Sequence, residues 1–335
     1  MTGLILDAVS INDLKELAVK AENSSFHSIW ATELYRTSFQ QLAAAASVTT
    51  NIKLGTAVAL AFTRSPLITA LTALDLDEFS EGRMILGLGT GAKNTNERYH
   101  GIYYGKPVKR IKECLEIINH YISSSYEVNE FKYKGDYYDI NTRGFKRAFK
   151  PVRENIPFFL AGIGEKMIKS SAQLADGYLG HVVCSLNYLK RIVLPAINNG
   201  LVESDKNRSN FTVSSIITCA VTDNYEKAKR AAKATIGFYA TVKTYRKPFE
   251  MAGFSDQAER IRKCYFDGDI KGMIDNVTDE MVEEFSVIGD DDRCREKIEN
   301  YRDIIDLPIL SAPHYFIDYE EVKEYQNGLL RVFGQ

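Results

Sequence analysis

The sequence contains no apolar run near the roughly 20 residues that a helix needs to cross a bilayer. Its N-terminus passes directly into the apolar segment GLILDAV, without the basic and then apolar pattern of a secretory leader. Neither sign of charge dominates, because 42 basic residues stand against 44 acidic ones and the formal net charge is −2. A nucleic-acid-binding surface is therefore not indicated. These absences predict a cytoplasmic protein that binds neither membrane nor nucleic acid.

Cysteine and histidine are also sparse, and neither shows the pattern of a metal site. The chain has 5 cysteines, widely spaced and odd in number, so the sequence offers neither a disulfide framework nor zinc-binding pairs. Among the histidines, His27, His100, His120 and His314 form no pair with the spacing of metal ligands. We expect a protein that works without a metal ion.

What the chain does contain is a regular alternation of short apolar segments with amphipathic helical segments. Eight strands are predicted, at Leu4–Val9, Ser28–Thr32, Ile52–Leu60, Arg83–Gly89, Pro157–Ala161, Gly177–Val183, Thr212–Val221 and Pro308–Ala312. Segments such as RMILGLG are apolar on both faces, which is typical of parallel strands covered by helices. The pattern predicts an α/β fold, a (β/α)8 TIM barrel formed by one domain over residues 1–335.

Two segments interrupt this alternation. Residues 125–156 are aromatic and basic, and they predict an excursion that contains a short hairpin. Residues 235–284 are rich in charge and mainly helical in pattern, and they predict an insertion. The segment Phe285–Asp290 is a candidate for one more short strand, which leaves the number of strands open.

The stretch RMILGLGTGAKN carries Gly87, Gly89 and Ala92 in the spacing of a dinucleotide-binding glycine loop. Such a loop follows the first strand of its unit and precedes an acidic residue by about 20 positions. Here it follows the fourth predicted strand, and the later stretch is the helical pattern VKRIKECLEII. The context argues against a dinucleotide site. At the carboxyl end of a barrel strand, the same glycines would let the backbone approach a flat ligand closely.

The segment LGTAVALAFTRSPLITALTALDLDEFSEGRMILGLGTGAKNTNERYHG, residues 54–101, resembles the luciferase-like monooxygenase superfamily. Within that superfamily it is most similar to the coenzyme F420-dependent oxidoreductases, which include methylenetetrahydromethanopterin reductase. The likeness continues in FFLAGIGEKMIKSSAQLADGYLGH, IGFYATVKTYRKPFEMAGF and FSVIGDDDRCREKI, and so extends over most of the chain. The resemblance implies a barrel without metal that holds a flavin or 5-deazaflavin across its mouth. Hydride transfer between that cofactor and a small organic substrate is the expected reaction.

The resemblance also implies where the cofactor ring lies. In relatives a non-proline cis peptide bond forms a bulge behind the ring, and by position it would join Ala57 and Val58 here. Glu33 stands where family members carry an acid near the cofactor, and it is a candidate both for cofactor binding and for catalysis. The alternative for Glu33 is a helix-start or ion-pair carboxylate.

Two further groups are expected at the same rim. Thr90 and Gly91, with Lys93 and Asn94, would surround the pyrimidine edge or tail of the cofactor, or else form a solvent loop. The turn Gly162–Ile163–Gly164 opens a helix and would present N–H groups to a phosphate, unless it is only a tight turn.

His181 ends the sixth predicted strand and is the second catalytic candidate. An imidazole has an ordinary pKa of about 6.5, so it is a natural general acid or base near neutral pH. A packed, hydrogen-bonded histidine is the alternative for this position.

Two positions depart from the sugar-phosphate dehydrogenase branch of the family. That branch carries a histidine directly after the second-strand acid and a glutamate after Gly-Thr-Gly, where this chain has Leu34 and Ala92. The departure argues against glucose 6-phosphate as substrate and favours a more apolar pocket.

Three functions therefore remain open: a coenzyme F420-dependent oxidoreductase, an FMN-dependent luciferase-like monooxygenase, and a flavin-binding barrel without activity. The phosphate–lactyl–oligoglutamate tail of coenzyme F420 needs an open, basic groove, to which Arg143–Arg153 is expected to contribute. A homodimer is expected from the family and from the frequency of two-fold oligomers.

Overall fold

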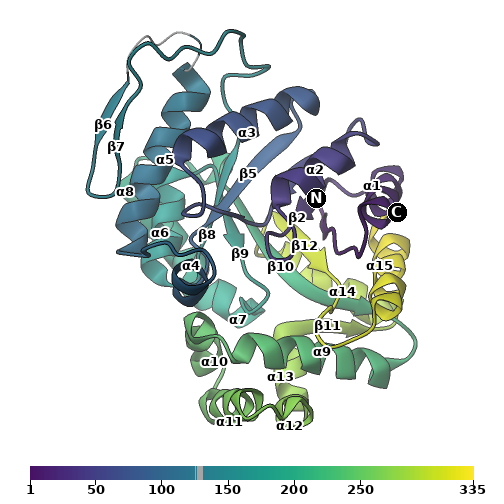
Figure 1. Cartoon of the computed structure of the whole chain (residues 1–335). Coiled ribbons are helices and arrows are strands. Elements are labelled where there is room, and N and C mark those ends of the chain that lie inside the picture. The colour runs from purple at the N-terminus through teal and green to yellow at the C-terminus, as the bar shows by residue number, and fades with distance from the viewer. Residues whose placement is uncertain (125, 127–130) are drawn as a thin grey trace.

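The computed structural model describes residues 1–124, 126 and 131–335, and its centre is a ring of parallel strands surrounded by helices (Figure 1). The ring consists of β1 (Gly3–Ile5), β2 (Ser28–Ala31), β3 (Lys53–Thr56), β5 (Met84–Gly89), β8 (Phe158–Ala161), β9 (Gly177–Gly180), β10 (Thr212–Val221) and β12 (Leu307–Ser311). Neighbours pair in the order β10-β12-β1-β2-β3-β5-β8-β9, and β9 pairs again with β10. The predicted eight-stranded closed barrel is confirmed.

The additional candidate strand also exists, but it lies outside the ring. β11 (Ser286–Gly289) pairs in parallel with the second half of β10, at residues 218–221. β9 pairs only with the first half of β10, from Thr212 to Ser215. The length of β10, which has 10 residues, is what allows it to carry three neighbours.

The interior of the barrel is filled around the single tryptophan of the chain. Trp30 is fully buried, and its indole Nε1–H donates a hydrogen bond to Ser28 Oγ at 2.8 Å. Glycine on the next strand makes room for the ring, because a Cβ on Gly55 would lie 2.2 Å from Trp30 Cε3. Phe159 of β8 packs against the indole at a centroid distance of 5.7 Å. Aromatic and aliphatic side chains therefore close the middle of the barrel, which is a packed core and not a pore.

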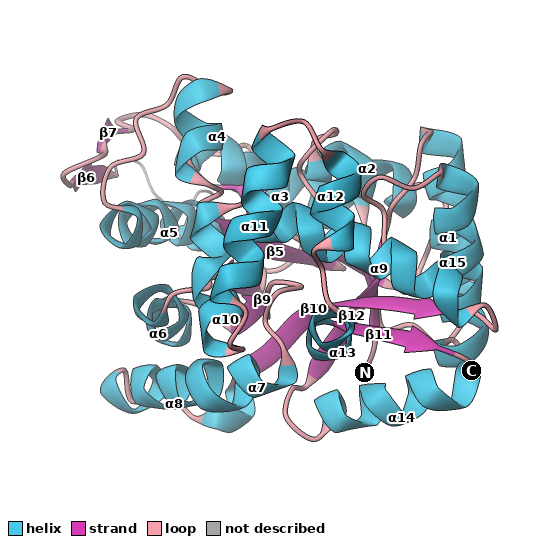
Figure 2. Ribbon diagram, turned by 90° about the horizontal axis from the view of Figure 1, so that it is seen from below, coloured by secondary structure: helices cyan, strands magenta, loops and turns pink. Residues whose placement is uncertain are grey.

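Helices cover the outside of the ring (Figure 2). They are α1 (Ile11–Asn23), α2 (Ser38–Ala46), α3 (Pro66–Phe79), α4 (Lys93–Arg98), α5 (Pro107–Ser124), α6 (Glu165–Leu174), α7 (Leu186–Tyr188), α8 (Leu194–Glu203), α9 (Tyr225–Ala240), α10 (Arg246–Met251), α11 (Ser255–Phe266), α12 (Ile270–Asp275), α13 (Asp279–Phe285), α14 (Asp291–Arg302) and α15 (Tyr319–Phe333). Local chemistry sets their starts: Ser10 and Asp13 form a capping box on α1, and Ser65 caps α3 ahead of Pro66.

Both predicted interruptions are present, on different sides of the barrel (Figure 1). The excursion contains an antiparallel hairpin of β6 (Lys132–Lys134) and β7 (Asp139–Asn141), which packs on α5. Residues 125 and 127–130 of the excursion lie outside the described residues. The insertion is helical, from the end of α9 through α10, α11, α12 and α13, and it shares a hydrophobic cluster with β11 and α15.

Two local predictions need correction. The predicted strand Ile52–Leu60 is interrupted, because β3 ends at Thr56 and a separate two-residue strand, β4 (Ala59–Leu60), pairs with β5. The segment after β5 was expected to continue as a loop, but it contains the short helix α4. Its buried Asn96 anchors the helix to the loop before it, a tertiary contact that sequence periodicity does not report.

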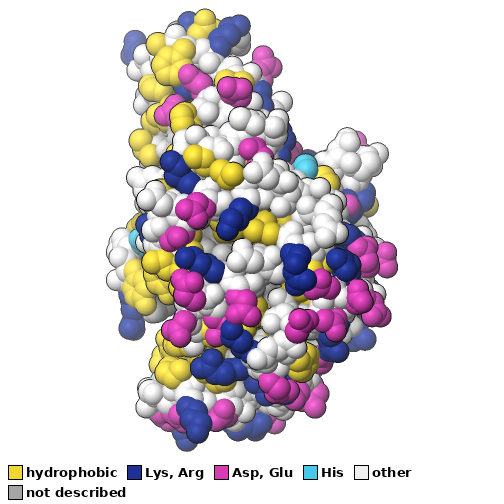
Figure 3. Space-filling view, turned by 90° about the vertical axis from the view of Figure 1, so that its right-hand side faces the viewer, with side chains coloured by type: hydrophobic (Ala, Val, Ile, Leu, Met, Phe, Trp, Pro, Cys, Tyr) yellow, Lys and Arg dark blue, Asp and Glu magenta, His cyan; other side chains and the backbone are white. Residues whose placement is uncertain are grey.

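No described helix is both long and apolar enough to span a bilayer. On the face shown in Figure 3, basic and acidic side chains alternate without a large area of one sign.

Candidate active site

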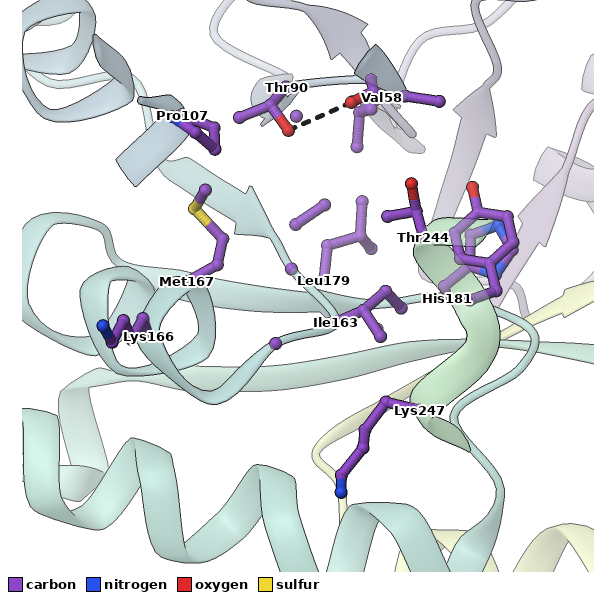
Figure 4. A pocket seen from close by; sticks show the side chains of 18 of the residues that line it. Val58, Thr90, Pro107, Ile163, Lys166, Met167, Leu179, His181, Thr244 and Lys247 are labelled. Carbon is purple, nitrogen blue, oxygen red and sulfur yellow. Dashed lines mark hydrogen bonds between the residues drawn. The ribbon is translucent and has the colours of Figure 1, made fainter. Parts of the chain in front are cut away.

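A cavity of about 710 Å³ opens at the carboxyl ends of β5, β8 and β9 (Figure 4). Its volume falls within the range typical of small-molecule and cofactor sites. Apolar side chains, backbone of the glycine turns and a few polar groups line it. The lining includes Ala57, Val58, Gly89, Thr90, Gly91, Ala92, Tyr104, Ala161, Gly162, Ile163, Gly164, Lys166, Leu179, His181, Tyr245 and Lys247.

The wall formed after β3 contains the backbone feature that the family resemblance implies. The peptide bond between Ala57 and Val58 is cis, which confirms the prediction for this position. Both residues line the cavity. Val58 packs directly over β5, since a Cβ on Gly89 would lie 2.6 Å from Val58 Cγ2. Glycine at position 89 is therefore required for Val58 to stand where it does.

The loop after β5 is held in place from two sides. Asn96 donates hydrogen bonds from Nδ2 to the carbonyl oxygens of Thr90 at 2.8 Å and Ala92 at 3.0 Å. The hydroxyl of Tyr104 lies 3.0 Å from Thr90 Oγ1 and donates to the carbonyl of Gly91 at 3.0 Å. Thr90 and Gly91 line the cavity as expected. Asn96 and Tyr104 are not predictable from the sequence for this role, because only the tertiary contact places them at the loop.

Lys93 and Asn94 are not among the residues that line the cavity. They lie in the first turn of α4, where Lys93 Nζ is 3.8 Å from Glu97 Oε1 across one helical turn. The structure thus separates the four residues that the sequence analysis grouped in one loop: the first two face the cavity, and the last two belong to an exposed helix.

The turn after β8 presents its backbone to the cavity. Gly162, Ile163 and Gly164 all line it, and Gly164 is the N-cap of α6 without a side-chain cap. A Cβ on Gly164 would meet no atom within 4 Å, so there is open space in front of this turn. The first N–H groups of a helix have no intrahelical acceptor, and they can bind an anionic group that enters this space.

His181 lies at the edge of the cavity with aromatic rings on two sides. Tyr245 stacks on the imidazole at a centroid distance of 4.2 Å, and Tyr239 meets it edge to face at 4.7 Å. The backbone N–H of Val183 donates to His181 Nδ1 at 3.4 Å. Because Nδ1 accepts this bond, the neutral ring carries its proton on Nε2.

Burial among these rings lowers the pKa of His181 to about 3. The imidazole is therefore neutral near pH 7, and its Nε2–H is a hydrogen-bond donor. A strongly populated imidazolium is not part of this site. This restricts the acid–base role expected from the sequence to a hydrogen bond from a neutral ring.

Glu33 is engaged away from the cavity and does not line it. Its Oε2 accepts hydrogen bonds from Arg64 Nη1 at 3.0 Å and from the backbone N–H of Leu60 at 3.0 Å, and Arg64 Nη2 binds Oε1. The structure therefore favours the alternative interpretation of Glu33, an ion-pair carboxylate. It ties the end of β2 to the segment that follows the bulge at Val58.

The helical insertion contributes directly to the cavity, whereas the basic excursion does not. Thr244, Tyr245 and Lys247 of the insertion line it. Arg147 instead pairs with Asp75 at 3.0 Å, on α3. Arg153 pairs with Asp77 at 2.7 Å, also on α3 and at the amino end of the barrel. The expectation that Arg143–Arg153 contributes to a cofactor groove is wrong, because these arginines neutralise carboxylates of α3.

No cluster of metal-ligating side chains accompanies the cavity. Within residues 1–124, 126 and 131–335, no group of three or more histidine, cysteine, aspartate or glutamate side chains has the arrangement of a metal site. The polar groups at the cavity are hydroxyls, one neutral imidazole, backbone amides, two lysines and the carboxylate of Glu165. Such a set suits an uncharged ring with an anionic appendage.

Comparison with known proteins agrees with this geometry. The family model of luciferase-like monooxygenases matches residues 2–306. The 5,10-methylenetetrahydromethanopterin reductase of Archaeoglobus fulgidus is 33% identical over 290 residues, which cover 83% of this chain and 82% of the relative.

Two solved structures share the fold. The coenzyme F420-dependent tetrahydromethanopterin reductase of Methanopyrus kandleri superposes with a TM-score of 0.81 at 25% identity, covering 99% of this chain and 96% of the other. The oxygenating constituent of 3,6-diketocamphane monooxygenase from Pseudomonas putida, in complex with FMN, gives 0.67 at 19% identity, with 99% and 97% covered. The likeness to the second protein shows the fold alone. The chain belongs to the luciferase-like monooxygenase family.

Proposed function

We propose that this protein is a coenzyme F420-dependent oxidoreductase that transfers a hydride between the deazaflavin and a small organic substrate. The observation that carries the proposal is the cavity at the carboxyl face, with the cis-linked pair Ala57–Val58 on one wall and the glycine turn of β8 on another. The relatives named for methylenetetrahydromethanopterin and for coenzyme F420 support a deazaflavin in preference to FMN.

The residues present fit such a cofactor. Val58 and Leu179 offer apolar surface to a flat ring, and the hydroxyl of Thr90 offers a hydrogen bond without adding charge. The N–H groups near Gly162 and Gly164 suit a phosphate. When bound, the deazaflavin would supply the carbon that accepts or donates the hydride; the protein supplies orientation and polarity.

His181 contributes a fixed hydrogen bond in this proposal. Its Nε2–H would donate to an oxygen or nitrogen of substrate or cofactor as charge develops there, while Val183 and Tyr245 keep the ring in one orientation. Because the ring stays neutral, it brings no charge near the path of the hydride. A neutral electrophile of this kind polarises a substrate without transferring its own proton.

Two other functions are alternatives that a cofactor titration can distinguish from this one. An FMN-dependent monooxygenase uses the same fold, and a barrel without activity would keep the cavity but not the chemistry. Equilibrium titration of the purified protein with coenzyme F420, FMN and NADPH, followed by fluorescence, separates them. We expect micromolar or tighter binding of coenzyme F420, weaker binding of FMN and none of NADPH.

Chemistry is then checked by following oxidation of the reduced deazaflavin at its absorption maximum with a panel of carbonyl, imine and alkene substrates. Tight FMN binding without a response to coenzyme F420 would overturn the proposal. Binding of coenzyme F420 without turnover of any substrate would favour the barrel without activity. The control is Lys169→Ala on α6 outside the cavity, where the half-buried Lys169 pairs with Glu203 at 2.5 Å.

A further inference from the structure

The hairpin of β6 and β7 lies against α5 and is held there by the carboxylate of Glu113 (Figure 1). Glu113 is 5% exposed, and its two oxygens accept the backbone N–H groups of Asp136 at 3.0 Å and Tyr137 at 2.9 Å. An ion pair between Lys109 and Asp136 adds a second tie at the same turn. A buried carboxylate that accepts two N–H groups fixes the backbone of such a turn. The side chain of Tyr137 therefore occupies a defined place beside α5.

From that place Tyr137 holds the segment that precedes α5. Residues 101–106 form neither helix nor strand. The hydroxyl of Tyr137 accepts the backbone N–H of Lys106 at 2.7 Å. Its ring lies against the backbone at Gly105, because a Cβ at that position would be 2.5 Å from Tyr137 Cε1. A hydrogen bond and close packing on two successive residues together determine where this segment runs.

Arg110 of α5 supports the same segment from the side of the helix. Its guanidinium lies over the ring of Phe62, 4.3 Å from the ring centroid, and 5.8 Å from the ring centroid of Tyr137. It also donates to the carbonyl oxygen of Tyr103. Phe62 in turn meets the ring of Tyr104 edge to face at a centroid distance of 5.7 Å. Because a cation is attracted to each aromatic face, Arg110 links the hairpin to the residues before α5.

The segment held in this way borders the cavity at both of its ends. Tyr104 and Pro107 line the cavity. Gly105 and Lys106 lie between them in the chain, and these are the two residues that Tyr137 contacts. Tyr137 itself is not among the residues that line the cavity. A shift of the segment would therefore move two lining residues, although the contact that holds it lies outside.

Tyr104 connects this segment to the loop after β5. Its hydroxyl lies 3.0 Å from Thr90 Oγ1 and donates to the carbonyl oxygen of Gly91 at 3.0 Å. Both of these residues line the cavity, and Figure 4 shows Thr90 at its wall. In the proposed function the hydroxyl of Thr90 offers a hydrogen bond to the ring of the cofactor. A continuous series of contacts thus runs from the hairpin to a group that faces the ligand.

We propose that Tyr137 is a positioning residue for the cofactor cavity, and that it acts through Tyr104 on the wall formed by Thr90 and Gly91. The inference rests on the proposed function, because the ligand that this wall meets is the ring of the deazaflavin. It assigns a role to the excursion, whose described hairpin residues line no part of the cavity. Tyr137 touches no ligand in this proposal, and it determines the place of groups that do.

The expected effects separate the hydroxyl of Tyr137 from its ring. Tyr137→Phe removes the bond to Lys106 but keeps the ring on Gly105, and one hydrogen bond corresponds to about a two- to tenfold change in an equilibrium. We expect binding of coenzyme F420 to weaken about threefold in this variant, and more than about tenfold in Tyr137→Ala, which also loses the packing. The matched controls are Tyr133→Phe and Tyr133→Ala, because Tyr133 lies on the same hairpin and its hydroxyl donates to Glu116 of α5 at 2.6 Å. Their affinities should stay within about twofold of the wild type.

The first measurement needs no ligand. Hydrogen exchange, followed by mass spectrometry, is compared for peptides that cover residues 90–104 in the free wild type and in each variant. These peptides leave out Lys106, whose own N–H loses its acceptor in the variants. Circular dichroism and the urea midpoint establish that each variant is folded, and Tyr137→Phe keeps the test available if Tyr137→Ala is not.

The second measurement is a double-mutant cycle on binding. Dissociation constants for coenzyme F420 are determined by fluorescence for the wild type, Tyr104→Phe, Tyr137→Phe and the double variant. We expect about a fivefold loss for Tyr104→Phe, because it removes the hydroxyl that contacts both Thr90 and Gly91. If Tyr137 acts through Tyr104, the double variant should also lose about fivefold, whereas independent effects would multiply to about fifteenfold.

The proposal predicts faster exchange over residues 90–104 in the Tyr137 variants, unchanged exchange in the Tyr133 controls, and losses of affinity that do not multiply. Unchanged exchange, or multiplying losses in the cycle, would overturn it. Equal losses in the Tyr133 controls would also overturn it, since they would assign the effect to the attachment of the whole hairpin. In each of these cases the wild type still binds the deazaflavin, so the proposed function stands. A wild type that binds no deazaflavin overturns the proposed function and this inference together.

Discussion

The two ends of the barrel differ in how completely their polar groups are satisfied. At the amino end, the guanidinium of the buried Arg83 donates to the carbonyls of Ser80 at 2.7 Å, Ile52 at 3.1 Å and Thr49 at 2.9 Å. Asp77, which is 1% exposed, accepts from Arg153 and from the backbone N–H of Met84. Arg83 is thus enclosed and hydrogen-bonded to backbone carbonyls, and Asp77 is enclosed and ion-paired with Arg153.

At the carboxyl end, several groups keep unused capacity. Lys166 and Lys247 line the cavity, and neither forms an ion pair with a described residue. The backbone N–H of Val183 donates to His181 Nδ1, so the neutral ring has an N–H donor at Nε2. Asp7 follows β1 and has a buried Oδ2 without a hydrogen-bond partner in the described residues, although His314 lies 3.6 Å away. Burial raises the pKa of Asp7, and the nearby His314 opposes that shift.

The difference teaches that folding and binding are served by different ends of the same strands. Satisfied buried charges stabilise one geometry, whereas groups with unused hydrogen-bonding capacity at the loop end are available to a ligand, and active sites of such barrels lie at this end. Substitutions at the amino end should therefore affect stability more than binding. Substitutions at the carboxyl end should affect binding more than stability.

The largest effect is expected for Asp77→Ala. This change removes the carboxylate partner of the Arg153 guanidinium, which keeps its bond to the carbonyl of Met84, and it removes the acceptor for the N–H of Met84. Breaking a buried pair by removing one member costs about 3–5 kcal/mol. We expect a loss of unfolding free energy near the lower end of this range, because the Arg153 side chain is 29% exposed. The measurement is the urea midpoint of unfolding. Cofactor affinity of the folded fraction should stay within twofold of the wild type. A larger change in affinity would contradict the view that the amino end affects stability more than binding.

A smaller effect on stability, but a larger one on binding, is expected for Gly89→Ala. The new methyl group would meet Val58 Cγ2 at 2.6 Å, so Val58 must move at the wall of the cavity. Overpacking of this kind costs about 1–3 kcal/mol. We expect cofactor binding to weaken by more than tenfold while the protein remains folded by circular dichroism. Unchanged affinity would show that the Val58 wall does not contact the ligand.

The smallest effect concerns pH and His181→Gln. In the folded protein the pKa of His181 is about 3, below the ordinary 6.5, so between these values the unfolded chain binds a proton that the folded chain does not. The stabilisation from the neutral ring is present above pH 6.5 and is lost as pH falls toward 3. From pH 7 to pH 5 the wild type should lose about 2 kcal/mol more unfolding free energy than the variant. Parallel pH profiles would indicate an imidazole with an ordinary pKa.

Local sequence patterns were sufficient for much of the architecture and for part of the site. The helix Pro66–Phe79 has its start encoded locally, because Ser65 caps it and a proline occupies its first position. The interruption of Ile52–Leu60 at Val58 was not predicted from periodicity, since both halves are equally apolar. The cis bond itself was expected only from the family resemblance.

The sequence by itself determined the alternation of strands and helices, the glycines at the rim and the family, because these depend on local residue preferences and on motifs continuous in the chain. Only the tertiary structure decided which polar groups face the cavity. It paired Glu33 with Arg64 and Arg153 with Asp77, and it brought Lys247 of the helical insertion to the lining of the cavity. The physical reason is that a charge is neutralised by whichever opposite charge folding brings near, and separation along the chain does not encode that distance.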